Sequence, residues 1–279
     1  MTRRHRSDVL RTVVIAAAVI ACLLPLVWTL LASFGIHPDA SRTPPTWVGS
    51  PTLDHYLEIG AARLQYVSKL LTSIALGVLT TFVTVLVAFP AAYGLARSSF
   101  RGREIAVQAL IVLASLPVIA YLIPLRETLH ALRLYDTLLG AALAEVGLYA
   151  PLATYVLHGY LRHSPVDIEQ AARLEGATTA HVLWRIVLPV VGPGVAATAI
   201  VVLVMSWNQV LMPLVLTLNV KTVPVSMIDF FTYERELEWP TAAAALIASL
   251  APIWAVVIGA HRFLERFSLD GGATMAWKP

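Results

Sequence analysis

The chain has 279 residues, of which 58% are hydrophobic and only 13% are charged, and its formal net charge at pH 7 is +3. One or two soluble domains are excluded, because a soluble protein of this size still exposes many residues to water and carries about 25% charged residues on average. The basic residues are scattered through short loops, which also argues against a nucleic-acid-binding patch. The composition therefore predicts an all-α integral membrane protein with several spans.

Six stretches of the sequence are long and apolar enough to cross a bilayer, which takes about 20 residues each. They predict spans at about 12–34, 70–96, 105–125, 137–161, 193–216 and 240–261. The fourth is interrupted only by Glu145. The fifth belongs to a longer uncharged run in which Pro189 and Pro193 should interrupt the helix near its start. We expect one membrane domain at 12–264, between an N-terminal tail at 1–11 and a C-terminal tail at 265–279.

The distribution of arginine and lysine predicts the orientation of these spans. The two tails and the loops on their side of the membrane carry 13 of the 20 basic residues, and the opposite loops carry 7. Cytoplasmic loops carry the excess of positive charge in membrane proteins. Both termini are therefore predicted to be cytoplasmic, together with the loop at 162–190 between the fourth and fifth spans.

This cytoplasmic loop carries the signals of a short helix that is bounded at both ends. The helix start combines a capping hydroxyl, a proline at the first position and a carboxylate in the first turn, at Ser164, Pro165 and Asp167. Gly176 should end the helix, because glycine tolerates a left-handed turn. We expect one helix at about 165–175 and a second at about 179–187, before Pro189.

Two interpretations of the first helix are open on physical grounds. The small side chains of Ala171 and Ala172 would expose the backbone, so that the helix could seat closely in a groove of a partner protein. The helix could equally be a surface segment that only links two spans.

The pattern Ala171-Ala172-x3-Gly176-x9-Ile186-x-Leu188-Pro189 resembles the cytoplasmic signature of ABC importer permeases, E-A-A-x3-G-x9-I-x-L-P, at every spacing. These permeases are the inner-membrane components of binding-protein-dependent transport systems. In this family the loop contacts a separate ATPase. The resemblance thus implies the ATPase-coupling residues Glu169, Gln170, Ala171, Ala172, Glu175, Gly176, Ile186, Leu188 and Pro189. Gln170 replaces the usual glutamate, so either Glu169 supplies the ionic contact to the ATPase or the contact is weaker.

Two further segments resemble this family, the end of the second span at 91–97 and the segment 206–214 in the fifth span. Residues 223–225 and the C-terminal residues 271–279 resemble its carbohydrate branch, in particular the smaller maltose-type subunit, although the last three residues depart from the usual ending. The resemblance covers nearly the whole chain. It implies the type I importer permease fold, with six transmembrane helices and a coupling helix between spans four and five.

The resemblance also implies partners and a location. We expect a heterodimer with a second permease subunit, two ATP-binding cassette subunits and an extracytoplasmic solute-binding protein, in the lipid membrane of a bacterial cell. No G-x-x-x-x-G-K-[ST] phosphate loop occurs in the sequence, so ATP and magnesium are expected on the partner ATPase. No cofactor or metal is expected on this chain, since His158 and His163 are five residues apart rather than three or four.

Glu145, Trp207 and Asn208 are candidates for the translocation path. A carboxylate at membrane depth is a functional candidate by default, although it could also pair with a neighbour such as Arg133. A tryptophan face beside an amide suits a sugar ring, but the same pair could be an interface tryptophan and a helix-packing asparagine. The sequence thus predicts a transport component, not an enzyme, for a sugar, an amino sugar or a glycerol-phosphate derivative. The alternative is a proton-coupled secondary transporter that uses Glu145.

Overall fold

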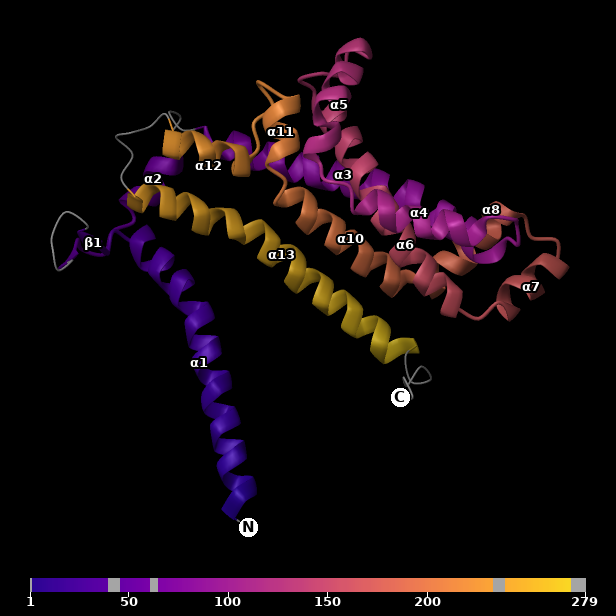
Figure 1. Cartoon of the computed structure of the whole chain (residues 1–279), viewed down its shortest axis with the longest axis horizontal. Coiled ribbons are helices and arrows are strands. Elements are labelled where there is room, and N and C mark those ends of the chain that lie inside the picture. Colours follow the sequence, from indigo (N-terminus) through magenta and orange to yellow (C-terminus); the bar gives the residue numbers. More distant parts are fainter. Residues whose placement is uncertain (1, 40–45, 61–64, 233–238, 272–279) are drawn as a thin grey trace. The chain divides into compact units, whose positions relative to one another are not determined.

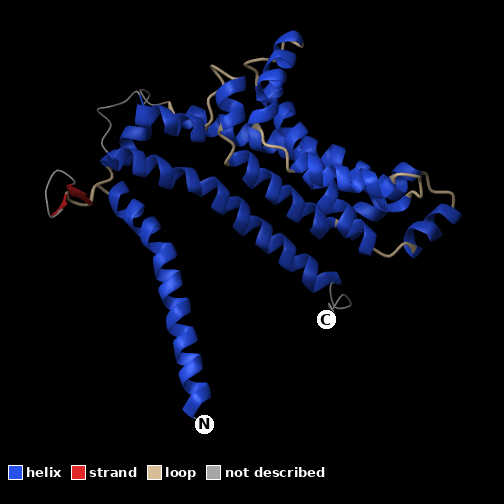
Figure 2. Cartoon of the chain, viewed as in Figure 1, coloured by secondary structure: helices blue, strands red, loops and turns tan. Residues whose placement is uncertain are grey.

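The computed structural model describes residues 2–39, 46–60, 65–232 and 239–271, and most of these residues are helical (Figures 1 and 2). The elements in chain order are α1 (Thr2–Ser33), β1 (His37–Asp39), β2 (Thr46–Val48), α2 (Asp54–Gly60), α3 (Tyr66–Arg97), α4 (Arg103–Ala114), α5 (Ile119–Ala131), α6 (Leu138–His163), α7 (Asp167–Leu174), α8 (Thr179–His181), the π-helix η1 (Val182–Val187), α9 (Leu188–Val190), α10 (Gly192–Trp207), α11 (Leu211–Leu216), α12 (Val223–Thr232) and α13 (Trp239–Gly271).

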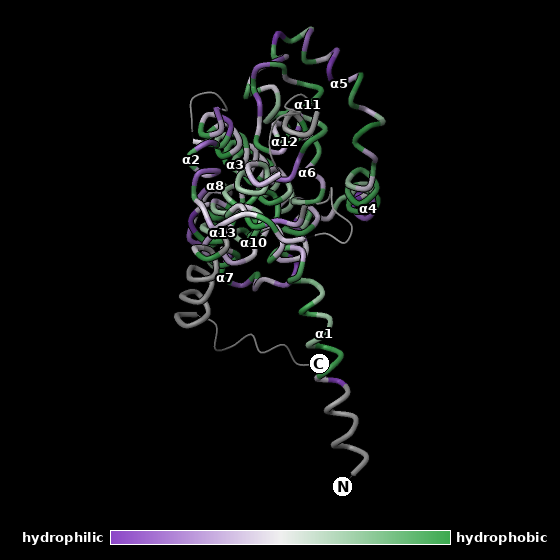
Figure 3. The backbone as a smooth tube through the Cα atoms, turned by 90° about the vertical axis from the view of Figure 1, so that its left-hand side faces the viewer, coloured by the Kyte–Doolittle hydropathy of each residue, from purple (hydrophilic) through white to green (hydrophobic). Residues whose placement is uncertain are grey.

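Four of the described helices are long and apolar enough to cross a membrane, at Arg11–Ser33, Tyr66–Arg97, Leu138–His163 and Trp239–Val256. Two bent helix pairs would raise this number to six if each pair forms one span. Figure 3 shows the hydrophobic residues that follow one another along the described part of α1. The structure is therefore that of a helical protein with four to six candidate spans.

The stretch at 105–125 is not the single helix that its hydropathy suggested. It is divided between α4 and α5, whose axes differ by 93°. Ser115 ends α4, and Pro117 lies in the short connection before α5. Proline has no backbone N–H and disfavours a helical conformation of the residue before it, so it interrupts the helical hydrogen bonds where the chain turns.

The second predicted helix of the 162–190 loop also differs from expectation. It does not end before Pro189, because α8, η1 and α9 form one helical segment, Thr179–Val190. The chain bends by 81° after this segment, where α10 begins at Gly192. The predicted span at 193–216 is likewise divided between α10 and α11.

Both predicted tails contain helix. α1 already begins at Thr2, inside the predicted tail at 1–11. α13 continues to Gly271, past the expected end of the membrane domain at 264, and the rest of the tail lies outside the described residues.

The chain divides into two compact units, Met1–Ser68 with Met227–Ala251 and Lys69–Ser226 with Pro252–Pro279. In the first unit, β1 and β2 pair antiparallel with His37 opposite Val48. Side chains of α2 bind the start of α13, where Thr241 Oγ1 donates a hydrogen bond to Glu58 at 2.7 Å and lies 3.1 Å from His55 Nδ1.

The second unit is built around α3, α6 and α10, which run alongside one another (Figure 1). One apolar core joins these three helices to the 162–190 loop. Its buried members include Phe89 and Ala92 on α3, Leu157 and Leu161 on α6, Val182 and Val187 on η1, and Val202 on α10. The loop is thus packed on the ends of the long helices.

The start of α6 is held by a close backbone approach at Gly140. A Cβ atom at this position would lie 2.0 Å from the backbone oxygen of Leu134. We therefore expect Gly140→Ala to destabilise the protein by about 1–3 kcal/mol through overpacking. Among the residues that the structure describes, none outside the adjacent helix backbone comes within 4 Å of a would-be Cβ at Gly147 on the same helix, so Gly147→Ala should be stabilising by about 0.5–1 kcal/mol. The measurement is the thermal unfolding of each variant in detergent. Equal melting temperatures of Gly140→Ala and Gly147→Ala would contradict the expected difference.

Candidate functional site

The helix α7, Asp167–Leu174, is the first candidate site. It begins two residues later than the sequence predicted, and Ser164 does not cap it. Ser164 instead ends α6: its Oγ donates to the backbone oxygen of Leu161 at 2.9 Å and accepts from Arg97 Nη2 at 2.6 Å. The predicted cap is wrong because Arg97, 67 residues away in sequence, engages the hydroxyl.

The predicted end of this helix at Gly176 is confirmed. Gly176 has a φ of +88°, the left-handed conformation. The backbone N–H of Ala177 donates to Ala172 at 3.0 Å, and that of Gly176 donates to Arg173 at 3.1 Å. These two bonds are the Schellman arrangement, which satisfies carbonyl groups at the end of a helix.

The outer surface of α7 is apolar as well as polar. Leu174 is 91% exposed and Ile168 is 51% exposed. Gln170, Ala171 and Glu175 are also exposed. Ala172 was expected to be exposed, but it packs against the core of the second unit. An isolated chain therefore presents two aliphatic side chains to solvent on an eight-residue helix, which suits a surface that a partner covers.

The inner surface of α7 carries the buried carboxylate of Glu169, which is only 4% exposed. Its Oε1 accepts from Arg97 Nη2 at 2.7 Å and Nε at 3.0 Å, and its Oε2 accepts from Tyr93 Oη at 3.0 Å. Arg173 donates in turn to Tyr93 Oη at 3.1 Å. Both oxygens of Glu169 are thus bound inside the chain.

The remaining residues of the signature lie on the second half of the loop. Ile186 and Leu188 are half-buried and pack against the same core, whereas Pro189 is exposed. The signature therefore divides into an exposed part on and after α7 and a part that holds the loop on α3 and α6.

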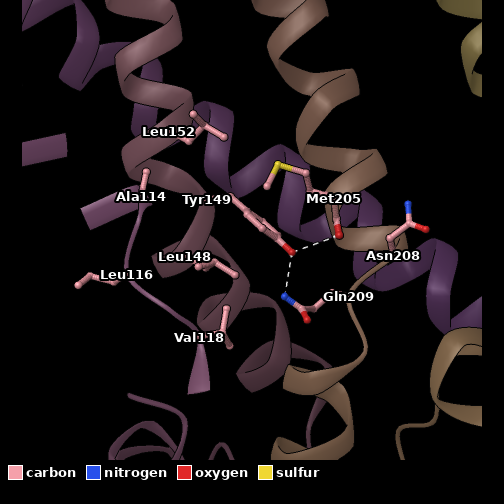
Figure 4. Close-up of a pocket in the computed structure, with 9 residues that line it drawn as sticks. All are labelled: Ala114, Leu116, Val118, Leu148, Tyr149, Leu152, Met205, Asn208 and Gln209. Carbon is pink, nitrogen blue, oxygen red and sulfur yellow. Dashed lines mark hydrogen bonds between the residues drawn. The ribbon is translucent and has the colours of Figure 1, made fainter. Parts of the chain in front are cut away.

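A pocket between α6, the end of α10 and the connection of α4 to α5 is the second candidate site (Figure 4). Its volume is about 410 Å³, and it is lined by Ala114, Leu116, Val118, Leu148, Tyr149, Leu152, Met205, Asn208 and Gln209. Tyr149 Oη donates to the backbone oxygen of Met205 at 3.2 Å and accepts from Gln209 Nε2 at 3.2 Å. An apolar lining with a few fixed polar groups is typical of a small-molecule site.

Of the three predicted path residues, only Asn208 lines this pocket. Its Nδ2 donates to the backbone oxygen of Val204 at 2.7 Å. Trp207 is 8% exposed and is not among the lining residues.

Glu145 also lies outside the lining, fully buried, with 0% exposure. Its Oε2 accepts from Thr80 Oγ1 at 3.1 Å and from Ser206 Oγ, so the carboxylate joins α3, α6 and α10. None of its described hydrogen bonds involves Arg133.

Two polar residues of the pocket were not identified from the sequence. Tyr149 lies four residues after Glu145, one helical turn along α6, and this spacing is a signal that could have found it. Gln209 directly follows Asn208 in the quoted segment 206–214. Nothing in the sequence showed that its amide would bind the Tyr149 hydroxyl.

One junction outside the candidate spans is held by a carboxylate. Asp136 accepts hydrogen bonds from the backbone N–H groups of Asn219 at 2.8 Å and Leu218 at 2.7 Å. These bonds favour the charged form, so they lower the pKa of Asp136 below its usual value. The connection between α5 and α6 is thereby fixed to the connection between α11 and α12.

Among the described residues, no cluster of three or more His, Cys, Asp or Glu side chains is placed to hold a metal ion. The candidate sites offer a helical surface, a buried ion pair and an apolar pocket. They do not assemble a nucleophile with a base.

A sequence model of binding-protein-dependent transport system inner membrane components matches residues 84–268. The chain is 32% identical to the trehalose transport system permease protein SugB of Mycobacterium tuberculosis over 95% of each chain. It is 29% identical to the trehalose/maltose transport system permease protein MalG of Thermococcus litoralis, over 89% of this chain and 91% of that one.

The fold matches that of solved transporters. A chain of a bacterial ABC transporter involved in the import of the acidic polysaccharide alginate superposes with a TM-score of 0.77 at 17% identity, over 94% of this chain and 98% of that chain. The alginate transporter in complex with an alginate pentasaccharide-bound periplasmic protein gives a TM-score of 0.67 at 12% identity, over 96% and 98% of the two chains.

Proposed function

Because the chain belongs to the family of binding-protein-dependent transport system inner-membrane components, we propose that it forms half of the translocation pathway of an ATP-driven importer. Members of this family are transport components and not enzymes. The solute is a carbohydrate or a related compound such as an amino sugar or a glycerol-phosphate derivative. The observation that carries this proposal is the nearly full-length match to permeases named for trehalose and maltose transport.

The proposed assembly has a second permease subunit, two ATP-binding cassette subunits that bind ATP and magnesium, and an extracytoplasmic solute-binding protein. The likeness to an alginate transporter complexed with a periplasmic protein supports the last of these partners. In this proposal the chain crosses the bacterial plasma membrane six times, each of the two bent helix pairs forming one span, and both termini lie in the cytoplasm. The excess of basic residues on that side supports the orientation.

In this proposal the exposed surface of α7 and the turn at Gly176 dock in the ATPase. The exposed Leu174, Ile168 and Ala171 supply an apolar contact, and Gln170 and Glu175 supply polar ones. A docked α7 moves with the ATPase when ATP binds. The loop is packed on α3 and α6, so this movement reaches the membrane helices and shifts the equilibrium between inward- and outward-open states.

The pocket between α6 and α10 is the proposed part of the path that contacts solute. Asn208, Gln209 and the Tyr149 hydroxyl offer donors and acceptors for sugar hydroxyls, and the aromatic ring offers an apolar face. Glu145 and Trp207, the other predicted path residues, are buried and do not line this pocket, and the Glu145 carboxylate joins α6 to α10 through Ser206.

The proton-coupled alternative finds no support among the relatives, and Glu145 gives a direct test of it. Glu145→Gln keeps an oxygen that accepts from Thr80 and Ser206, and its amide nitrogen replaces Oε1, which has no hydrogen-bond partner among the described residues. We expect ATP-driven uptake in liposomes within about threefold of the unmodified rate. As a control, Glu145→Leu leaves two buried hydroxyls without their acceptor, which costs about 1–3 kcal/mol each, and should impair uptake. Loss of a proton-dependent uptake in Glu145→Gln would instead favour the alternative.

The proposed function is tested by purifying the tagged chain from its native membranes in mild detergent and identifying the associated proteins by mass spectrometry. Recovery of an ATPase and a second permease is the expected result. A chain that is purified alone and transports in liposomes without ATP would contradict the proposal.

A further inference from the structure

The ion pair between Arg97 and Glu169 joins two segments that are 72 residues apart in the sequence. Arg97 is the last residue of α3, and Glu169 lies in the first turn of α7. The side chains are 15% and 6% exposed. Burying two charges is unfavourable unless geometry and further hydrogen bonds compensate. Here both compensations are present, since Arg97 makes two bonds to one carboxylate oxygen.

The surrounding hydrogen bonds extend this ion pair to the end of α6. Arg97 Nη2 also donates to Ser164 Oγ at 2.6 Å, and Tyr93 Oη donates to the second oxygen of Glu169. Arg173, one turn after Glu169, donates to Tyr93. We call these five residues, Tyr93, Arg97, Ser164, Glu169 and Arg173, the α3–α7 brace.

The buried carboxylate of the brace lies on a different side of α7 from the exposed aliphatic residues. Leu174 and Ile168 face solvent, whereas Glu169 faces α3. A partner that binds the exposed surface therefore does not need to contact Glu169. Such a partner would displace α7 together with the end of α3, which is bound to Glu169.

Near its middle, α3 contacts the polar cluster beside the pocket. Thr80 lies on α3, about 25 Å before Arg97 at 1.5 Å per residue, and donates to Glu145. Glu145 also accepts from Ser206 on α10, three residues before the pocket residue Gln209. The brace thus gives α7 a contact to α3 that is independent of the covalent connections through α6 and η1.

We propose that Arg97 and Glu169 are positioning residues that transmit the displacement of α7 to α3, and that this contact, rather than ATPase docking, is the role of Glu169. The proposal rests on the proposed function, because it needs an ATPase that moves α7. It assigns Glu169 to an internal partner and leaves docking to the exposed residues.

The experiment measures three quantities on the assembly reconstituted in liposomes: the amount of ATPase subunit bound, the rate of ATP hydrolysis, and the rate of uptake of the solute. Glu169→Gln keeps the shape and the Tyr93 hydrogen bond but removes the charge. Arg97→Gln removes the other charge. We expect bound ATPase and ATP hydrolysis to persist in both, while uptake per ATP falls at least about tenfold.

Two further variants separate transmission from folding and docking. The double variant Arg97→Gln with Glu169→Gln should be no worse than either single one, since both remove the same interaction. Arg97→Lys, which keeps the charge, should recover part of the coupling. Arg162→Gln removes an exposed positive charge from the last turn of α6 and serves as the matched control with normal coupling.

Three outcomes would overturn the proposal. Unchanged uptake per ATP in Arg97→Gln would make the ion pair purely structural. Impairment in Glu169→Gln alone, with Arg97→Gln normal, would mean that Glu169 acts directly on the ATPase. Loss of bound ATPase in both single variants would assign the pair to docking. An unmodified chain that neither binds an ATPase nor shows ATP-dependent uptake would instead refute the proposed function.

Discussion

Gly176→Val is expected to abolish uptake, to below about a tenth of the unmodified rate, while the chain still reaches the membrane. The left-handed conformation at φ +88° costs a non-glycine residue roughly 1–2 kcal/mol, and more for a β-branched one. Apart from the adjacent residues, no atom in the described part of the chain lies within 4 Å of a would-be Cβ, so the change acts through the backbone and through the docking surface. The measurement is solute uptake in liposomes, normalised to the amount of chain inserted.

Two controls separate these causes. Gly102, with φ +91° and equally free space around its would-be Cβ, lies between α3 and α4, and Gly102→Val should leave most of the transport intact. Gly176→Asn adds a side chain that tolerates the left-handed conformation, and should retain more uptake than Gly176→Val. Normal transport in Gly176→Val would contradict the coupling role of the loop.

The success of the sequence analysis at Gly176 has a local cause. A left-handed residue after a helix is most often glycine, and the two hydrogen bonds that close the helix involve only neighbours in sequence. The long apolar helices α3 and α6 were predictable for a similar reason, because a run of about 20 apolar residues is by itself the sequence signal of a membrane-spanning helix.

Two of the misses, at Ser164 and Glu169, have non-local causes. Ser164 carries the sequence signal of a cap, yet its hydroxyl is bound by Arg97 from a distant helix. Glu169 resembles an exposed contact residue, and only the approach of α3 shows that it is buried. The bend between α4 and α5 cannot be seen in hydropathy, which records that 105–125 is apolar but not that the chain turns by 93°.

The pocket was the part least accessible to prediction. Its polar groups come from α6 and from the end of α10, some 60 residues apart, and the Tyr149 and Gln209 hydrogen bond exists only when these helices lie side by side. Chemical reasoning selected Trp207 as the aromatic partner of Asn208. The helix end instead places Asn208 and Gln209 at the pocket, with Tyr149 as the aromatic residue beside them.

Leu174→Asp is expected to release the ATPase from the assembly. Leu174 is 91% exposed at the end of α7 and contributes nothing to the core of this chain. A loss of bound ATPase on its substitution therefore reports a contact with the partner. The loss of a central apolar contact in a protein interface costs about 2 kcal/mol or more, which corresponds to roughly a 30-fold weaker affinity. The measurement is the amount of ATPase that is purified with the tagged chain in mild detergent.

The charge introduced by aspartate has a second effect, which the controls must remove. A negative charge in the last turn of a helix opposes the helix dipole by about 0.3–1 kcal/mol, whereas a positive charge favours it. If lost apolar contact is the cause, Leu174→Lys should also release the ATPase, although it does not weaken α7. Leu174→Met keeps an apolar side chain of similar volume and should retain binding. Unchanged recovery of ATPase with both Leu174→Asp and Leu174→Lys would mean that the partner does not cover this surface, and the docking surface would then have to be sought elsewhere on the loop.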